Sequence, residues 1–490
     1  MITRFLVLDV GTTGLRAAVV DERLDVVAYA YRANPPDTPF DGLVEFDATR
    51  LAELALDACH DVLSEFDETV SAVGITNQRA STVVWDRATG VPVAPGLGWQ
   101  DLRTITECLV AKAEHDWTIA PNQSITKIAS ILAGVDNATD RDLCFGTIDS
   151  WLAWTLSSGA VHVSDATNMS TTTTGLRVAD GSDWDHQRLD AFGIGEAMLP
   201  TVVDSAGIVA DAVRLPGSPP IAALVGDQQA SLIGQGCVEV GAAKLTLGTG
   251  GMFDLVTGAE SPTEVRRNPA GTYALPTWQL AGVRTWGAEG IMLSAGTNVE
   301  WLRDDLGLIE TSDQSHQIAN GCADTGGVVY VPALLGLGTP RWDYGARGAL
   351  LGLTRGTERS HVVRAVLEGV AHRSADIIDA ARTDTGVRIE ALRLDGGMSE
   401  NPTVVQSLAD ATGLPVEVSP TPEATTRGAA FLAGLALGRF TSIGDAAQLW
   451  RPASVVQPDP TIDRTARRSR WADAVDRAGG WHPELSALDF

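Results

Sequence analysis

Residues 5–20 read FLVLDVGTTGLRAAVV, in which two apolar runs flank a Gly-Thr-Thr-Gly turn. The first run, 5–9, predicts a buried strand, and the second, 15–20, predicts a strand that returns antiparallel from the turn. The stretch therefore predicts a β-hairpin that carries two hydroxyl groups, those of Thr12 and Thr13, at its tip.

Helical and apolar segments alternate after this hairpin. Residues 49–65 have helical periodicity, and 70–76 form a short apolar run that is typical of a strand. This alternation predicts an α/β class, with mixed sheets flanked by helices.

The hairpin pattern recurs in the second half of the chain. Residues 243–257 read AKLTLGTGGMFDLVT, again a strand, a Gly-Thr turn and a returning strand. The repetition predicts a duplicated domain, with an N-terminal domain over 1–238 and a C-terminal domain over 239–490. The cleft between two such domains is a natural place for a ligand.

Length and charge restrict the class of protein. The chain has 490 residues, and single hydrophobic cores stop growing at roughly 250–300 residues, so two domains are expected. Its 62 acidic and 36 basic residues give a formal net charge of -26, which repels nucleic acids and anionic membrane surfaces. We therefore expect neither as a partner. Backbone N–H groups in glycine-rich turns still allow a phosphate ligand.

The cysteines and the N-terminal segment indicate a cytoplasmic protein. The five cysteines are scattered, with no Cys-x-x-Cys pair, which is typical of reduced, buried thiols. The N-terminal segment lacks the apolar region and cleavage site of a signal peptide, and no apolar segment approaches the roughly 20 residues of a membrane helix. We expect a cytoplasmic location.

Three glycine-rich turns suit a nucleotide. The tip of the first hairpin offers the Asp9 carboxylate, hydroxyl groups and N–H groups, which suit a phosphate with its Mg²⁺. Alone, such a turn is more often only a turn. The turns at 11–14, 248–251 and 396–397 lie in both predicted domains, and their convergence on one triphosphate matches the actin-like, or ribonuclease H-like, plan. The sequence has no P-loop or G-x-G-x-x-G motif.

A series of short blocks runs almost the length of the chain. They are GITNQR (74–79), TVVWD (82–86), WQDLRT (99–104), GTIDSW (146–151), GDQQA (226–230), GTG (248–250), ARGA (346–349), GLTRG (352–356), LEGVA (367–371) and DGG (395–397). In this order they resemble the FGGY carbohydrate kinases, in the glycerol kinase-like branch of that family.

The resemblance implies a kinase that uses ATP and Mg²⁺ to phosphorylate a hydroxyl of a small polyol or sugar. It implies that Asp227 is the catalytic base and that Gln228 also faces the substrate. Arg79 and Trp99 are similar to residues of the polyol pocket. Members of the family often form homodimers or homotetramers, so either assembly is an expectation here.

The resemblance also implies a nucleotide site shared by both domains. On the first domain, Asp9 is similar to a residue on the Mg²⁺ side, and the phosphate contacts would be Thr12, Thr13, Gly14 and Arg16. On the second domain, the contacts to ADP or ATP would be Thr249, Gly296, Gly397 and Asn401, while Glu300 replaces the Gln that glycerol kinases usually have.

The polyol pocket departs from the glycerol kinase pattern at three positions. Ala80 stands where glycerol kinases have a Glu that grips a substrate hydroxyl, Asn122 where they have a Tyr, and Met252 where they have a Phe. Ala80 and Asn122 are smaller than those residues, which predicts a roomier pocket for a four- or five-carbon polyol or ketose. The alternative is a glycerol kinase that still works through Arg79, Trp99 and Asp227.

Two functions of other classes remain open alongside the kinase. One is a catalytically silent, actin-like nucleotide-binding regulator, and the other is a nucleotide or polyphosphate hydrolase on the same fold. The Gly226-Asp227-Gln228 block argues against the silent protein, because such a protein has no need of a base beside a polyol pocket.

Overall fold

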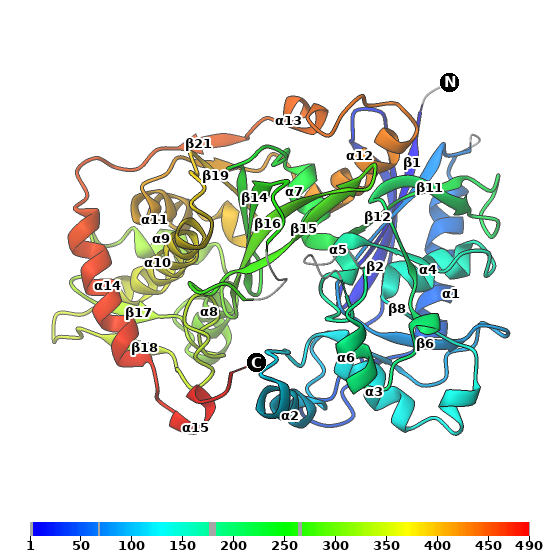
Figure 1. The fold of residues 1–490 in the computed structure, drawn as a ribbon. Coiled ribbons are helices and arrows are strands. Elements are labelled where there is room, and N and C mark those ends of the chain that lie inside the picture. The colour runs from blue at the N-terminus through cyan, green and yellow to red at the C-terminus, as the bar shows by residue number, and fades with distance from the viewer. Residues whose placement is uncertain (1–2, 67–68, 176–182, 263–266, 490) are drawn as a thin grey trace.

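The computed structural model describes residues 3–66, 69–175, 183–262 and 267–489. Two large sheets dominate it, each flanked by helices (Figure 1). One is six-stranded, in the order β11-β12-β5-β1-β2-β3, and the other is seven-stranded, in the order β15-β16-β14-β13-β19-β20-β21. The predicted α/β class with mixed sheets is confirmed.

The first sheet is built around the predicted hairpin. Its strands are β1 (Phe5–Val10), β2 (Gly14–Val20), β3 (Val26–Ala33), β5 (Ala72–Asn77), β11 (Ala206–Asp211) and β12 (Pro220–Gly226). β1 and β2 pair antiparallel, whereas β1, β5 and β12 are parallel neighbours. The carboxyl ends of these three central strands therefore lie at one edge of the sheet.

Both faces of β1 are buried, which explains its continuous apolar run. Leu6 and Leu8 pack in the cluster that includes α1 (Ala48–Leu63) and α4 (Ile148–Leu156). Phe5 and Val7 point to the opposite face and pack in a cluster with Phe431 of α12 (Ala424–Ala436). The first sheet is thus a middle layer between helices that come from opposite ends of the chain.

The second sheet repeats the hairpin. Its strands are β13 (Ala243–Leu247), β14 (Gly251–Gly258), β15 (Tyr273–Leu280), β16 (Val283–Met292), β19 (Leu392–Asp395), β20 (Val416–Val418) and β21 (Ser454–Val456). β13 pairs antiparallel with β14 and parallel with β19. The long helix α10 (Arg359–Thr385) and α11 (Pro402–Thr412) pack beside it.

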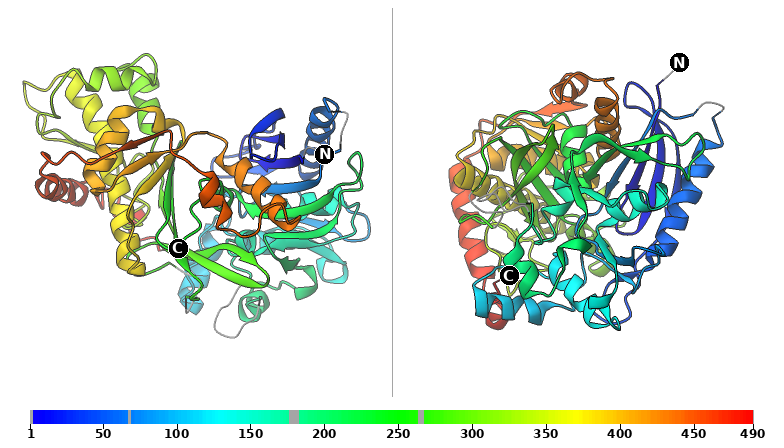
Figure 2. Two further views of the ribbon diagram at one scale, coloured as in Figure 1. Left: turned by 90° about the horizontal axis from the view of Figure 1, so that it is seen from above. Right: turned by 45° about the vertical axis from the view of Figure 1, so that its right-hand side comes forward.

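Helix α12 joins the two halves. It packs against α7 (Asp227–Gly234), and the pair lies between the sheets when the molecule is seen from above (Figure 2). The contact needs small residues, because a Cβ at Gly234 of α7 would lie 1.9 Å from the carbonyl oxygen of Ala424 of α12. The division at residue 238 stays a prediction, and α12 of the later segment covers the first sheet.

Further strands are β4 (Glu45–Phe46), β6 (Val83–Asp86), β7 (Gly96–Leu97), β8 (Leu143–Gly146), β9 (Val163–Asp165), β10 (Thr201–Val203), β17 (Val329–Val331) and β18 (Ala349–Leu351). Further helices are α2 (Ile105–His115), α3 (Ser124–Ala133), α5 (Ala166–Met169), α6 (His186–Ala191), α8 (Thr297–Glu300), α9 (Gln314–Ala319), α13 (Asp445–Leu449), α14 (Arg464–Ala478) and α15 (Pro483–Ser486). Across the described residues, no helix combines the length and apolar character needed to cross a bilayer.

Candidate active site

Several of the predicted site residues lie where strand ends of the two sheets face each other. In the first sheet, Asp9 pairs with Thr76 of β5, and β5 ends two residues before Arg79. Asp227 follows the end of the neighbouring β12. In the second sheet, Asp395 ends β19, and its carboxylate accepts a 3.3 Å hydrogen bond from Ser231 of α7. Ligands of open α/β sheets bind outside such carboxyl ends.

Asp227 lies at the first turn of α7. Its Oδ1 accepts a 2.8 Å hydrogen bond from the backbone N–H of Gln228 and lies 3.7 Å from Nε of Arg79. Burial raises the pKa of the Asp227 carboxyl, while Arg79 and the Gln228 N–H act in the opposite direction. A carboxylate of this kind can accept a proton from a nearby hydroxyl.

Arg79 is held from the other side by a residue that the sequence did not single out. Its Nη2 lies 2.6 Å from Oε2 of Glu289, which is on β16 of the second sheet, and both side chains are almost fully buried. Burial, and then the nearby Asp254, raise the pKa of Glu289 to about 7, although Arg79 favours its charged form. The signal available in the sequence was Glu289 itself, an acidic residue within an otherwise largely apolar strand.

Lys244 and Asp254 form a second buried ion pair that the sequence reasoning also missed. Nζ of Lys244 lies 3.0 Å from Oδ2 of Asp254 and donates a 2.8 Å hydrogen bond to Oε1 of Gln228. The predicted substrate residue Gln228 is therefore tied to the second sheet.

The predicted polyol wall is assembled from three loops. The carbonyl oxygen of Ala80 accepts a 3.1 Å hydrogen bond from Oγ of Ser124, which places the 122–124 segment beside residue 80. The buried Lys127 donates to the carbonyl oxygens of Gly98, at 2.7 Å, and Asn122, at 3.1 Å. The segments that carry Trp99, Ala80 and Asn122 are thereby fixed to one another.

Two features of this wall bear on what it can bind. Ala80 is buried in the left-handed region, with φ 61°, so its small side chain occupies a fixed place. Among the described residues, no hydrogen-bond partner reaches the buried Oδ1 of Asn122. Met252 comes from the second sheet, where it is half-buried opposite Thr246 of β13.

The predicted phosphate hairpin lies next to this wall. The indole N–H of Trp99 donates a 3.2 Å hydrogen bond to Oγ1 of Thr12, and Thr13 is exposed. Gly14 has no room for a Cβ because the ring of Tyr31 lies against it. Arg16 forms an ion pair with Glu423.

Asp9 has a carboxylate suited to a divalent cation. Burial, and then the charge of Asp227, raise its pKa to about 7, so a cation would relieve the repulsion between these two acids. Within the described ranges, no cluster of three or more His, Cys, Asp or Glu side chains could hold a metal by itself. The Asp9 carboxylate next to Asp227 fits Mg²⁺, which is commonly bound by one or two carboxylates together with phosphates.

Three of the predicted nucleotide residues lie at or beside the glycine-rich turns of the second sheet, 248–251 and 396–397. Gly296 donates from its N–H to the carbonyl oxygen of Gly248, at 2.8 Å, and a Cβ at Gly296 would come within 2.6 Å of that oxygen. Thr249 is exposed at the turn. By contrast, a Cβ on Gly397 would meet nothing within 4 Å, so open space adjoins the turn.

Two of the predicted nucleotide residues differ in how their side chains are held. Asn401 caps α11, because its Oδ1 accepts from the N–H groups of Thr403 and Val404 while its Nδ2 donates to Ser315 at 2.8 Å. Glu300 is exposed at the end of α8. The roles of both residues in nucleotide binding stay predictions.

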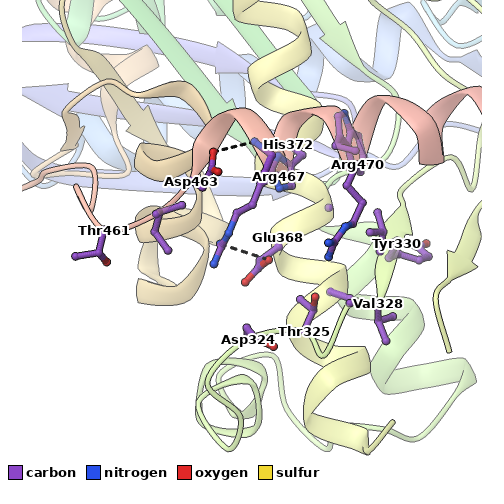
Figure 3. Close-up of a pocket in the computed structure, with 17 residues that line it drawn as sticks. Asp324, Thr325, Val328, Tyr330, Glu368, His372, Thr461, Asp463, Arg467 and Arg470 are labelled. Carbon is purple, nitrogen blue, oxygen red and sulfur yellow. Dashed lines mark hydrogen bonds and ion pairs between the residues drawn. The ribbon is translucent and has the colours of Figure 1, made fainter. Parts of the chain in front are cut away.

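A separate pocket of about 320 Å³ lies between α10 and α14 (Figure 3). Arg467 and Arg470 of α14 reach over it, and Glu368 lies 4.0 Å from Arg467. None of the predicted site residues lines this pocket. It is therefore distinct from the site at the strand ends.

Comparison with known proteins gives a consistent match. Residues 4–234 match the N-terminal domain, and residues 243–437 the C-terminal domain, of the FGGY family of carbohydrate kinases. A glycerol kinase from Rhodopirellula baltica is 38% identical over 99% of this chain and 92% of its own length. A glycerol kinase from Rhodospirillum centenum is 40% identical over 98% of this chain and 99% of its own length.

Solved structures agree. The crystal structure of Plasmodium falciparum glycerol kinase with ADP has a TM-score of 0.89 and 28% identity, and the match covers 97% of this chain and 98% of that one. Gluconate kinase from Lactobacillus acidophilus has a TM-score of 0.86 at 20% identity, over 100% of this chain and 99% of that one, and supports the fold.

Proposed function

The chain belongs to the FGGY family of carbohydrate kinases, and on this basis we propose that it transfers a phosphoryl group from ATP to a hydroxyl of a small polyol or sugar. The observation that carries the proposal is the half-buried carboxylate of Asp227, 3.7 Å from Arg79, at the edge where the two sheets face each other. The silent regulator and the hydrolase are not favoured.

In this mechanism Asp227 accepts the proton of the attacking hydroxyl. Its raised pKa makes it a better base than an exposed Asp, and such assistance is typically worth about 10²–10⁴-fold in rate. Arg79 and Gln228 orient the acceptor, and Trp99 forms the apolar side of the polyol pocket.

The phosphate side rests on Asp9 and the hairpin tip. Asp9 would hold Mg²⁺, which neutralises charge on the transferring phosphoryl group when it is bound. Thr12 and Thr13 offer hydroxyls, while the glycine-rich turns of both sheets offer N–H donors. The proton leaves the acceptor for Oδ of Asp227, and ADP is the leaving group.

For the acceptor, we propose a polyol or ketose of four or five carbons. Ala80 and Asn122 are smaller than the Glu and Tyr that glycerol kinases usually have at these positions, and the Oδ1 of Asn122 has no hydrogen-bond partner among the described residues, so it could accept from an additional hydroxyl. Glycerol is the second candidate, because the chain is 38% and 40% identical to two glycerol kinases.

A substrate panel tests the function and the acceptor together. ATP consumption is measured with glycerol, tetritols, pentitols and ketopentoses, with and without Mg²⁺. Consumption that requires both a polyol and Mg²⁺ is expected, with the highest kcat/KM for a four- or five-carbon acceptor. ATP hydrolysis that no polyol changes would contradict the kinase, and a preference for glycerol would contradict the larger acceptor.

The assembly and the location stay predictions. We propose a homodimer or homotetramer, which analytical ultracentrifugation measures directly, and a cytoplasmic location.

A further inference from the structure

Three charged residues form a row across the second sheet. Lys244 of β13 pairs directly with Asp254 of β14, and Asp254 pairs directly with Glu289 of β16. Directly paired residues of neighbouring strands project on the same face of a sheet. All three side chains are buried, so this row is a fixed set of charges rather than a solvated surface.

The row contacts the first half of the molecule at both of its ends. At one end Lys244 donates a 2.8 Å hydrogen bond to Gln228, and at the other Glu289 pairs with Arg79 at 2.6 Å. Arg79 in turn lies 3.7 Å from Asp227, the neighbour of Gln228 in sequence. The contacts close into a ring that holds both residues expected to orient the acceptor.

Within this ring the Arg79 guanidinium lies near two carboxylates. Its closer partner is Glu289, at 2.6 Å, and the more distant one is Asp227, at 3.7 Å. Asp254 is already paired with Lys244 at 3.0 Å. A buried guanidinium that loses its partner takes the nearest remaining acid, because an unpaired buried charge is costly. Without Glu289, Arg79 would therefore move onto Asp227.

We propose that Glu289 is a positioning residue, which holds the Arg79 guanidinium away from Asp227 so that the carboxylate stays free for the acceptor hydroxyl. The inference rests on the proposed kinase function. It makes the acceptor pocket dependent on the second sheet, since the anchor of Arg79 comes from β16.

The test compares Glu289→Gln with a matched control. Glu368→Gln removes another Arg-paired acid, whose side chain is 12% exposed and lies 2.7 Å from Arg364 on α10, outside the site. For Glu289→Gln we expect KM for the polyol to rise and kcat to fall, each by about tenfold, with KM for ATP changed less than about twofold. For Glu368→Gln we expect only a lower melting temperature.

A double-mutant cycle separates positioning from a general structural role. In an Arg79→Ala background, adding Glu289→Gln is expected to change kcat and KM for the polyol by less than about twofold, because its target is gone. The double variant also lacks both buried charges, so it avoids the unpaired Glu289 of Arg79→Ala and the displaced Arg79 of Glu289→Gln. Glu289→Asp keeps the charge on a shorter side chain and is expected to be less impaired than Glu289→Gln.

Two results would overturn the inference. One is a Glu289→Gln enzyme whose kinetic constants match those of Glu368→Gln, and the other is a loss of the same size with and without Arg79. If Glu289→Gln does not fold, Glu289→Asp takes its place in the cycle, and equal losses in both backgrounds again contradict it. Lack of polyol-dependent activity in the unmodified enzyme contradicts the proposed function instead.

Discussion

The indole N–H of Trp99 donates a 3.2 Å hydrogen bond to the hydroxyl of Thr12. Trp99 belongs to the predicted polyol wall and Thr12 to the predicted phosphate hairpin, so the two predicted sites touch at this bond. Phosphoryl transfer requires the acceptor oxygen and the phosphorus to approach within about 3–3.5 Å. A direct contact between the two walls suits that requirement.

Asp227→Asn is expected to lower kcat by about 10²–10⁴-fold, because an amide cannot take the proton of the acceptor hydroxyl. KM for ATP should stay within a few-fold of its original value, roughly as expected when ground-state binding is kept. Polyol-dependent ATP consumption measures the effect. The control is Asp384→Asn, since Asp384 also accepts backbone N–H bonds, from Ala270 and Thr272, but lies outside the site. Full activity in Asp227→Asn would rule out its role as base.

Ala80→Glu is expected to shift preference toward glycerol. The added side chain fills the space beyond a three-carbon acceptor and supplies a charged hydrogen-bond acceptor, so the ratio of kcat/KM for glycerol to that for the best longer polyol should rise roughly tenfold to hundredfold. Ala80→Gln is the matched control, because it has the size without the charge and should give a smaller change. An unchanged ratio in both variants would mean that this position does not set acceptor length.

Gly397→Ala tests the predicted nucleotide contact by filling open space. A Cβ at Gly397 meets nothing within 4 Å, so the melting temperature should not change. The nucleotide would occupy that space, and KM for ATP is therefore expected to rise several-fold, roughly the effect of one lost contact. Gly195→Ala is the control, since a Cβ there also meets nothing within 4 Å and Gly195 has an extended backbone with φ -73°. Equal ATP kinetics in both variants would count against Gly397.

Lys127→Met is expected to change how stability depends on pH. Burial lowers the pKa of Lys127 to about 7, against 10.5 for an ordinary lysine. Between these two pKa values the unfolded chain binds one more proton than the folded chain. This group therefore makes the free energy of unfolding rise with pH, and the rise ends once the pH exceeds the pKa of Lys127 in the unfolded chain.

Urea unfolding at about pH 7 and pH 9 measures this change in the free energy of unfolding. The two pH values are chosen because they fall roughly within the window between those two pKa values. The unmodified protein should gain stability over this interval relative to Lys127→Met. Lys112→Met is the control: Asp116 raises the pKa of Lys112, which stays protonated in both states across this window. The same slope in the unmodified protein and in Lys127→Met would contradict the burial of a cation at this position.

Much of the frame could be predicted locally. The hairpins at 5–20 and 243–257 follow from apolar runs around Gly-Thr turns, and both are present as β1–β2 and β13–β14. Boundaries moved by a few residues, as with the helix expected over 49–65, which runs from Ala48 to Leu63. The ends of strands are also hard to predict, because they depend on pairing partners that are distant in sequence, as for β1 with β5 and β13 with β19.

What the sequence alone determined is therefore the repeated strand–turn–strand units and the family resemblance, which also named Asp9, Arg79 and Asp227 as candidate site residues. Periodicity and turn chemistry are local properties, so they can be read without coordinates. Only the tertiary structure decided that Glu289 and Lys244 reach Arg79 and Gln228. A buried charge is stable only with a partner, and which partner it meets depends on how the two sheets pack together.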